Sequence, residues 1–199
     1  MEAKPTVHII DDELSVRRSL GLLLLAEGFA VRTHESADDA LADRAALSSG
    51  CIVTDVRMPG LSGLDLIAAL RSAGIASPVI VMTGHADVGL AVSAMKAGAL
   101  DFIEKPFEPE ALVELVASAL RTAAPPDDTQ EVKRRFAQLS NRERQVFFRL
   151  VEGDTSKMIA NTLDLSPRTV EIYRGKVMLK MQAGSLSDIV RMALKSGLA

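Results

Sequence analysis

The fold is decided by a ten-residue stretch, CIVTDVRMPG at positions 51–60, in which a short apolar run ends at an acid. The run Cys51–Thr54 is bounded and apolar, which predicts a buried strand, and Asp55 follows it directly. Similar short runs predict four more strands, at Val7–Ile10, Ala30–Thr33, Val79–Met82 and Phe102–Glu104. Longer helical patterns separate them, at Leu14–Glu27, Ser36–Ala46, Ser62–Ala73, Val88–Ala97 and Pro109–Arg121. Alternating strands and helices predict a parallel sheet covered by helices on both sides.

Two of these predicted helices begin with a serine that is followed three residues later by an aspartate. The pairs are Ser36 with Asp39 and Ser62 with Asp65. This spacing predicts a capping box, in which each side chain bonds to the backbone N–H of the other residue.

Polar side chains follow the predicted strands at the edge where parallel strands place a binding site. They are Asp11 and Asp12 after the first strand, Asp55 after the third, Thr83 after the fourth and Lys105 after the fifth. Clustered carboxylates repel one another unless a cation lies between them, and hard oxygen ligands suit Mg²⁺. A lysine and a hydroxyl can neutralise and hydrogen-bond a phosphoryl group. The pocket is therefore expected to accept phosphate on one of its own carboxylates.

Charge divides the chain into two unlike halves. Residues 1–121 contain 10 Lys and Arg against 17 Asp and Glu, whereas residues 133–199 contain 13 against 6. An acidic half joined to a basic half predicts two domains, the basic one facing a polyanion. The stretch 122–129 contains two prolines and two acids without apolar periodicity, so we place a linker at 122–135 between domains at 5–121 and 136–198.

Composition excludes several classes of protein. The single cysteine, Cys51, excludes an intrachain disulfide, and its apolar neighbours predict a buried thiol in a reducing cytoplasm. The longest apolar run, Leu22–Ala26, is far shorter than the ~18 residues of a membrane span, so no membrane association is expected.

The basic half predicts four helices. They are expected from Ser140 to about Val151, over Ser156–Leu163, from Ser166 to about Met181, and from Ser185 to near Gly197. Ser140 and Ser185 open capping boxes, and Pro167 suits the first helical turn. Short helices with a tight turn between the middle two predict a helix-turn-helix unit.

The third of these helices has an apolar face and a polar face. Val170, Val177 and Met181 recur at helical spacing and are assigned to the core. A glycine inside a helix costs about 1 kcal/mol against alanine, so Gly175 on the opposite face needs a reason. Close approach to DNA and close packing against a neighbouring helix are both open.

The ordered motifs of the first half resemble the receiver domain of two-component response regulators. They are Asp11-Asp12-Glu13, Asp55 with Met58-Pro59-Gly60, Thr83-Gly84, Phe102 and Lys105-Pro106-Phe107. The resemblance implies a flavodoxin-like sheet of order 2-1-3-4-5 with Asp55 as phosphoacceptor. It further implies Mg²⁺ bound by Asp11, Asp12, Asp55 and the Arg57 backbone carbonyl, with Thr83, Phe102 and Lys105 as phosphoryl-contact and switch residues. The Lys105-Pro106 bond is expected to be cis, and His85 to modulate water access, whereas His8 and His34 are read as structural.

The second half resembles the LuxR/NarL-type helix-turn-helix, and the whole chain resembles FixJ-type response regulators. The supporting motifs are LSNRERQV at 139–146, KMIA at 157–160, LSPRTVE at 165–171, MTGHADV at 82–88 and MKAGA at 95–99. The resemblance implies base contacts from Glu171, Ile172 and Gly175, and phosphate contacts from Thr155, Lys157, Arg168, Thr169, Lys176 and Lys180. Ser156 departs from the pattern, because these regulators often have asparagine there.

The resemblance implies a phosphorylation-switched transcription factor of the cytoplasm. A sensor histidine kinase phosphorylates Asp55, the receivers form a homodimer, the basic domains bind promoter DNA, and RNA polymerase is a further partner. Beyond its own phosphorylation and slow dephosphorylation, no enzymatic turnover is expected.

Three other functions would share parts of this pattern. A phosphohydrolase with an aspartyl nucleophile would need an acid two residues after Asp55, where this chain has Arg57. The basic domain could instead bind RNA or an acidic protein. A salt-dependent duplex shift assay would distinguish such a domain from one that binds duplex DNA. A nucleotide-binding flavodoxin-like protein would need a glycine-rich loop after the first strand, which this sequence lacks.

Overall fold

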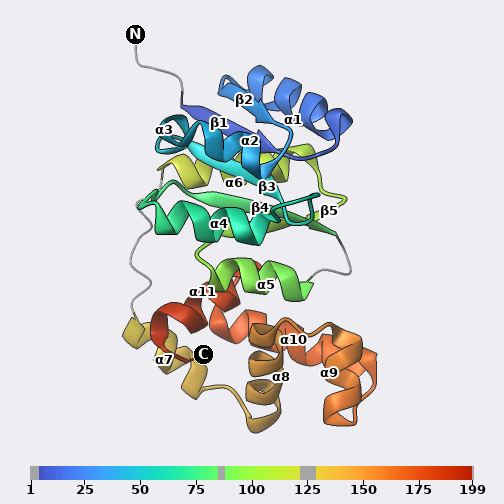
Figure 1. Ribbon diagram of the computed structural model, residues 1–199. Coiled ribbons are helices and arrows are strands. Elements are labelled where there is room, and N and C mark those ends of the chain that lie inside the picture. The colour runs from blue at the N-terminus through green and yellow to red at the C-terminus, as the bar shows by residue number, and fades with distance from the viewer. Residues whose placement is uncertain (1–4, 85–87, 122–128, 199) are drawn as a thin grey trace. The chain divides into compact units, whose positions relative to one another are not determined.

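A computed structural model of the 199-residue chain describes residues 5–84, 88–121 and 129–198 (Figure 1). The chain folds into two compact units. Within the described part of the chain, no helix is both long and apolar enough to cross a bilayer.

The first unit is built on a five-stranded parallel sheet of order β2-β1-β3-β4-β5, which confirms the expected 2-1-3-4-5 arrangement. Almost all residues of the central strands β1, β3 and β4 are buried, because helices lie on both faces of the sheet. The strands are β1 Thr6–Ile10, β2 Ala30–His34, β3 Cys51–Asp55, β4 Val79–Gly84 and β5 Asp101–Lys105.

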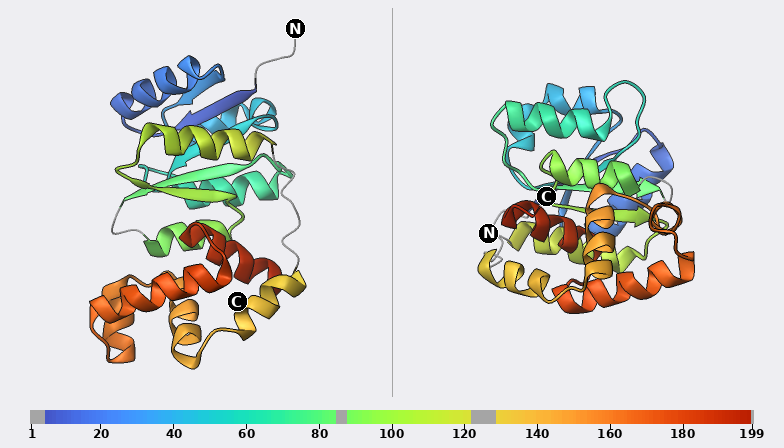
Figure 2. Two further views of the ribbon diagram at one scale, coloured as in Figure 1. Left: turned by 180° about the vertical axis from the view of Figure 1, so that it is seen from behind. Right: turned by 90° about the horizontal axis from the view of Figure 1, so that it is seen from below.

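Helices α1 and α6 cover one face of this sheet, as the view from behind shows (Figure 2). The core beneath them includes Leu24, Met82 and Val116, whose side chains are fully buried. Cys51 lies in the same core, and burial raises the pKa of its thiol to about 12, so the expected buried cysteine is confirmed. The helices within residues 5–121 are α1 Leu14–Ala26, α2 Ala37–Ala42, α3 Arg44–Leu47, α4 Gly63–Ser72, α5 Val88–Lys96 and α6 Pro109–Arg121.

Arg71, in the last turn of α4, joins the loops that enter β4 and β5. Its guanidinium donates to the carbonyl of Ile75 at 2.6 Å, of Ser77 at 3.2 Å and of Gly98 at 2.8 Å. These carbonyls lie at the amino ends of the strands, opposite the edge that carries Asp55.

The single helix expected over Ser36–Ala46 is wrong, because Asp43 divides it into α2 and α3. Asp43 leaves helical geometry (φ −110°, ψ 52°), and its carboxylate accepts from the backbone N–H of Ala46 at 3.4 Å. An aspartate that bonds to nearby backbone competes with the helix in this way. The box expected at Ser36 is also incomplete, since Asp39 accepts from the backbone N–H of Glu35.

The second unit is all helical, as expected. Its helices are α7 Thr129–Ala137, α8 Asn141–Glu152, α9 Ser156–Leu163, α10 Pro167–Met181 and α11 Leu186–Ser196. Complete capping boxes open α8 at Ser140 and α11 at Ser185. The turn between α9 and α10 is tight because Asp164 adopts left-handed geometry (φ 54°) and Ser166 caps α10. The core contains Val146, Phe147, Val170, Val177 and Met181, which confirms the apolar face assigned to α10.

The expected linker at 122–135 is too long. Residues 129–135 belong to α7, whose Val132 is 2% exposed and joins the core of the second unit. Phe136 packs edge-on against Phe147, with ring centroids 5.0 Å apart. The residues around Val132 are mostly polar, and they form a helix with one narrow apolar stripe. The remainder of the expected linker lies outside the described residues.

Candidate functional site

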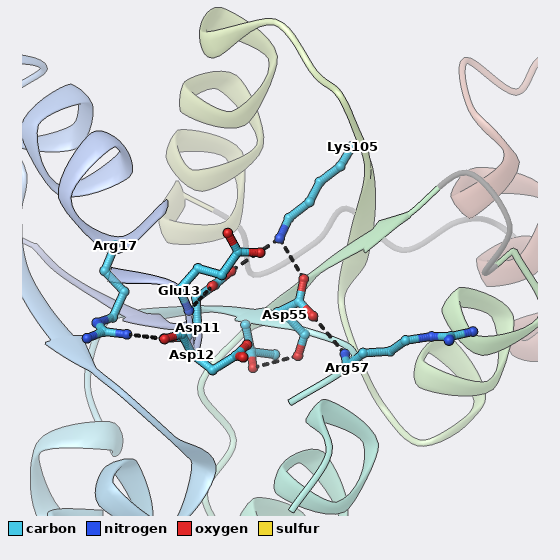
Figure 3. A network of polar contacts seen from close by, with 8 residues as sticks. Asp11, Asp12, Glu13, Arg17, Asp55, Arg57 and Lys105 are labelled. Atoms are coloured by element: carbon cyan, nitrogen blue, oxygen red, sulfur yellow. Dashed lines mark hydrogen bonds and ion pairs between the residues drawn. The ribbon is translucent and has the colours of Figure 1, made fainter. Parts of the chain in front are cut away.

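The carboxyl edge of the sheet brings two acids and one lysine together (Figure 3). Asp55 ends β3 and Lys105 ends β5, and the Lys105 ammonium lies 2.6 Å from Asp55 Oδ1 and 3.2 Å from Asp11 Oδ2. The second oxygen of Asp55 accepts from the backbone N–H of Arg57 at 2.8 Å. Burial alone would lower the pKa of Lys105, but the bonds and charges of Asp55 and Asp11 outweigh it and raise that pKa. Lys105 therefore stays cationic at physiological pH and offsets part of the negative charge of this cluster.

Two side chains, those of Asp11 and Arg17, hold the backbone of the loop after β1 in place. Asp11 is almost fully buried, and its Oδ1 accepts from the backbone N–H of Glu13 at 2.9 Å. Arg17, on the first turns of α1, donates to the carbonyls of Asp11 at 2.6 Å and Asp12 at 3.0 Å. These bonds leave the carboxylate of Asp12 exposed at the mouth of the site.

The donor set fits a hard divalent cation. Asp11 and Asp55 converge on one point, the Lys105 ammonium, and Asp12 comes from the same short loop as Asp11. Among the described residues, no three acid, histidine or cysteine side chains are yet gathered closely enough to form a metal cluster. Carboxylates and a peptide carbonyl are the ligands that Mg²⁺ takes while retaining water.

The remaining expected receiver residues lie on neighbouring strands. Thr83 is 1% exposed near the end of β4, and Phe102 is half-buried on β5, where it pairs with Val81. The peptide bond between Lys105 and Pro106 is cis, as expected. His85 lies outside the described residues.

His8 and His34 form a buried pair, which the sequence does not predict because the two residues lie 26 positions apart. His8 Nδ1 and His34 Nε2 are 3.2 Å apart across β1 and β2, and Asp39 lies 3.5 Å from the other nitrogen of His34. Burial lowers the pKa of both rings, which fits two neutral imidazoles sharing one hydrogen bond. This arrangement agrees with the structural role expected for both residues.

Most of the residues expected to contact DNA lie on the surface of α9 and α10. Lys157, Arg168, Glu171, Ile172, Gly175 and Lys176 are exposed. Gly175 resolves one open alternative, because a Cβ placed there would meet no atom within 4 Å. Among the residues that the structure describes, close packing against a neighbouring helix therefore does not explain a glycine at this position.

Three expected phosphate contacts are half-buried instead. Lys180 donates to Glu143 Oε2 at 2.6 Å and to the carbonyl of Gln138 at 3.3 Å, so its ammonium neutralises a buried acid of α8. The bond from Lys180 lowers the pKa of Glu143. Thr155 caps α9 by accepting from the backbone N–H of Met158, and Thr169 shares a hydrogen bond of 2.7 Å with Ser166.

Ser156, the position that departs from the related pattern, links two helices of the second unit. Its hydroxyl contacts Glu171 and accepts from Arg174 at 2.7 Å, which joins α9 to α10. Spacing alone could not show this contact, because the partners are 15 and 18 residues away.

Comparisons with known proteins agree with both units. Residues 7–117 match the model of the response regulator receiver domain, and residues 137–193 match that of the bacterial regulatory proteins of the luxR family. The transcriptional regulatory proteins FixJ of Azorhizobium caulinodans and Rhizobium meliloti are 53% and 50% identical to the chain. These matches cover 97% and 96% of this chain, and 93% and 96% of the relatives.

A solved structure extends the similarity to the whole chain. The crystal structure of full-length FixJ from B. japonicum is 46% identical, covers 99% of both chains and has a TM-score of 0.58. A receiver domain joined to a LuxR-type domain implies a kinase and DNA as partners. The chain belongs to the response regulators of the FixJ type, transcriptional regulators in which a receiver domain precedes a LuxR-type DNA-binding domain.

Proposed function

We propose that Asp55 accepts a phosphoryl group from a sensor histidine kinase and that this controls DNA binding in the cytoplasm. The observation that carries the proposal is the fixed Asp55 carboxylate, held between the Lys105 ammonium and the Arg57 backbone N–H. One carboxylate oxygen attacks phosphorus while the bond from phosphorus to the kinase histidine breaks. Lys105, which already pairs with Asp55, then neutralises an oxygen of the new acyl phosphate.

Mg²⁺ is the cofactor proposed for this step. Asp11, Asp12, Asp55 and the Arg57 carbonyl would hold it, and when bound it would offset the negative charge that gathers on the phosphoryl oxygens. The convergence of Asp11 and Asp55 on one cationic point supports this assignment.

Phosphorylation is proposed to shift a population of receiver conformations. Thr83 is buried on β4, and Phe102 is half-buried on the neighbouring β5. A phosphoryl oxygen that recruits the Thr83 hydroxyl would free space for the Phe102 ring and reshape the surface that pairs two receivers. The phosphoryl group can favour that state only by its differential interaction with it.

The dimer would then present two recognition helices to adjacent half-sites on promoter DNA. Exposed Lys157, Arg168 and Lys176 support phosphate contacts, and Glu171 and Ile172 support base contacts. Contact with RNA polymerase would follow once the dimer occupies the promoter.

Turnover is proposed to be slow. Arg57, two residues after Asp55, donates its backbone N–H to the carboxylate, and a guanidinium cannot serve as a general acid. The acyl phosphate would therefore persist as a signal, whereas a hydrolase would consume it.

The test is incubation with Mg²⁺ and acetyl phosphate, followed by intact mass measurement. Wild type should gain one phosphoryl group and Asp55→Asn none. Asp38→Asn, which alters an exposed acid of the same unit, is the matched control and should gain one. Phosphorylation of Asp55→Asn would move the acceptor elsewhere. Sedimentation with beryllofluoride, a phosphoryl mimic, tests dimerisation, and an unchanged monomer would refute that step.

A further inference from the structure

The hydroxyl of Ser156 links the two helices of the helix-turn-helix. Ser156 is the first residue of α9, and its Oγ donates to Glu171 Oε1 on α10. Arg174, one turn further along α10, donates to Ser156 Oγ at 2.7 Å and to the same oxygen of Glu171 at 3.1 Å. The hydroxyl thus uses both its donor and its acceptor capacity.

This cluster fixes a side chain that lies on the exposed face of α10. The Glu171 side chain is 58% exposed, yet Oε1 is held by two donors. Its other oxygen, Oε2, has no partner among the described residues. A glutamate side chain that is already ordered loses less conformational entropy when that free oxygen binds a ligand.

We propose that Ser156 is a positioning residue for DNA sequence readout. With Arg174, it aims the free oxygen of Glu171 at the exocyclic amine of a cytosine in the major groove, since a carboxylate accepts from that group. This inference rests on the proposed base contact of α10. Ser156 itself touches no base, and it sets how strongly one base is preferred.

A purely structural clamp between α9 and α10 is the competing explanation. It predicts that loss of the hydroxyl lowers stability and leaves base preference unchanged. Readout through Glu171 predicts the reverse. Stability is kept because the contact between Arg174 and Glu171 within α10 remains, whereas base preference falls because Glu171 Oε1 loses one of its two donors.

The test selects duplexes from a randomised pool with the full-length protein, activated by beryllofluoride and Mg²⁺. Wild type, Ser156→Ala, Ser156→Thr, Glu171→Ala and the Ser156→Ala/Glu171→Ala double variant are compared. Wild type should favour cytosine at one position of each half-site by about tenfold. Ser156→Ala should reduce this preference to roughly twofold, and Ser156→Thr, which keeps the hydroxyl, should retain it. The double variant should match Glu171→Ala.

Affinity for random duplex and the thermal midpoint are measured on the same proteins, and both should stay close to wild type in Ser156→Ala. Full cytosine preference in Ser156→Ala would overturn the positioning role. Equally, a lowered midpoint with unchanged preference would identify a structural clamp. If Glu171→Ala retains the preference, the base contact itself is wrong. If wild type selects no duplex, DNA binding as proposed here fails.

Discussion

Replacing Gly175 with alanine should stabilise the second unit while weakening specific DNA binding. Gly175 lies inside α10 on its exposed face, and an added Cβ meets no atom within 4 Å. Alanine in a helix interior is favoured over glycine by about 1 kcal/mol, and here no steric cost opposes that gain. For a unit of this size, such a gain raises the midpoint of thermal unfolding by roughly 4–8 °C.

The same methyl group would lie where α10 is proposed to approach the bases. Loss of one close apposition in the major groove should weaken binding to a selected duplex about tenfold, which is ~1.4 kcal/mol. Binding to random duplex, which depends on phosphate contacts, should change little. Calorimetry of the full-length protein and fluorescence anisotropy with both duplexes measure the two effects.

The matched control is Gly21→Ala in α1. A Cβ there would lie 3.9 Å from Val31, which is ordinary contact distance, so this variant gains helix propensity without touching α10. Its affinity for the selected duplex should equal that of wild type. The reasoning is refuted if Gly175→Ala binds that duplex as well as wild type does, or if it lowers the thermal midpoint.

Four further outcomes are expected. Lys180→Met should lower the free energy of unfolding by about 1–3 kcal/mol, because it leaves the buried Glu143 carboxylate without its cation. If this variant binds random duplex with the affinity of wild type, Lys180 is not a phosphate contact. The lowered pKa of Glu143 adds stability that is present above the ordinary pKa of 4.5 and is lost as the pH falls through the pKa of the folded state. In Glu143→Gln, the free energy of unfolding in urea should therefore change less between pH 6 and pH 3 than in wild type. An equal change in both proteins would contradict this. Val132→Ala should cost about 1–3 kcal/mol in urea unfolding if α7 is part of the core, and no cost would return residue 132 to a linker. The lowered pKa values of His8 and His34 make both rings titrate below 6.5 in the folded protein, and an NMR titration that finds either one above 6.5 would show the paired neutral rings to be wrong.

The sheet and its edge could be predicted because their signals are local. Short apolar runs predict the strands, and the ends of parallel strands place Asp11, Asp55 and Lys105 at one edge, where the structure has them. Parallel pairing leaves few alternatives once the strands are assigned.

Contacts between distant residues could not be predicted in the same way. Lys180 lies 37 residues from Glu143, and as a lysine on a basic helix it was expected to bind phosphate. The break at Asp43 depends on a single side chain that bonds to its own backbone, and helical periodicity continues through it. Helix α7 was missed because only one of its residues, Val132, is fully buried in an otherwise polar segment.

Arg71 has a mechanical consequence for signalling. By bonding three carbonyls at the amino ends of β4 and β5, its guanidinium makes that end of the sheet stiff. When Thr83 and Lys105 move, β4 and β5 then cannot shift along their whole length, because Arg71 holds their amino ends. The two strands would pivot about the end that Arg71 anchors, so a shift that begins beside the acceptor carboxylate would be largest at that edge of the sheet and small at the amino ends. One arginine at the opposite end of the strands from Asp55 would thus confine their movement to the edge that carries the acceptor.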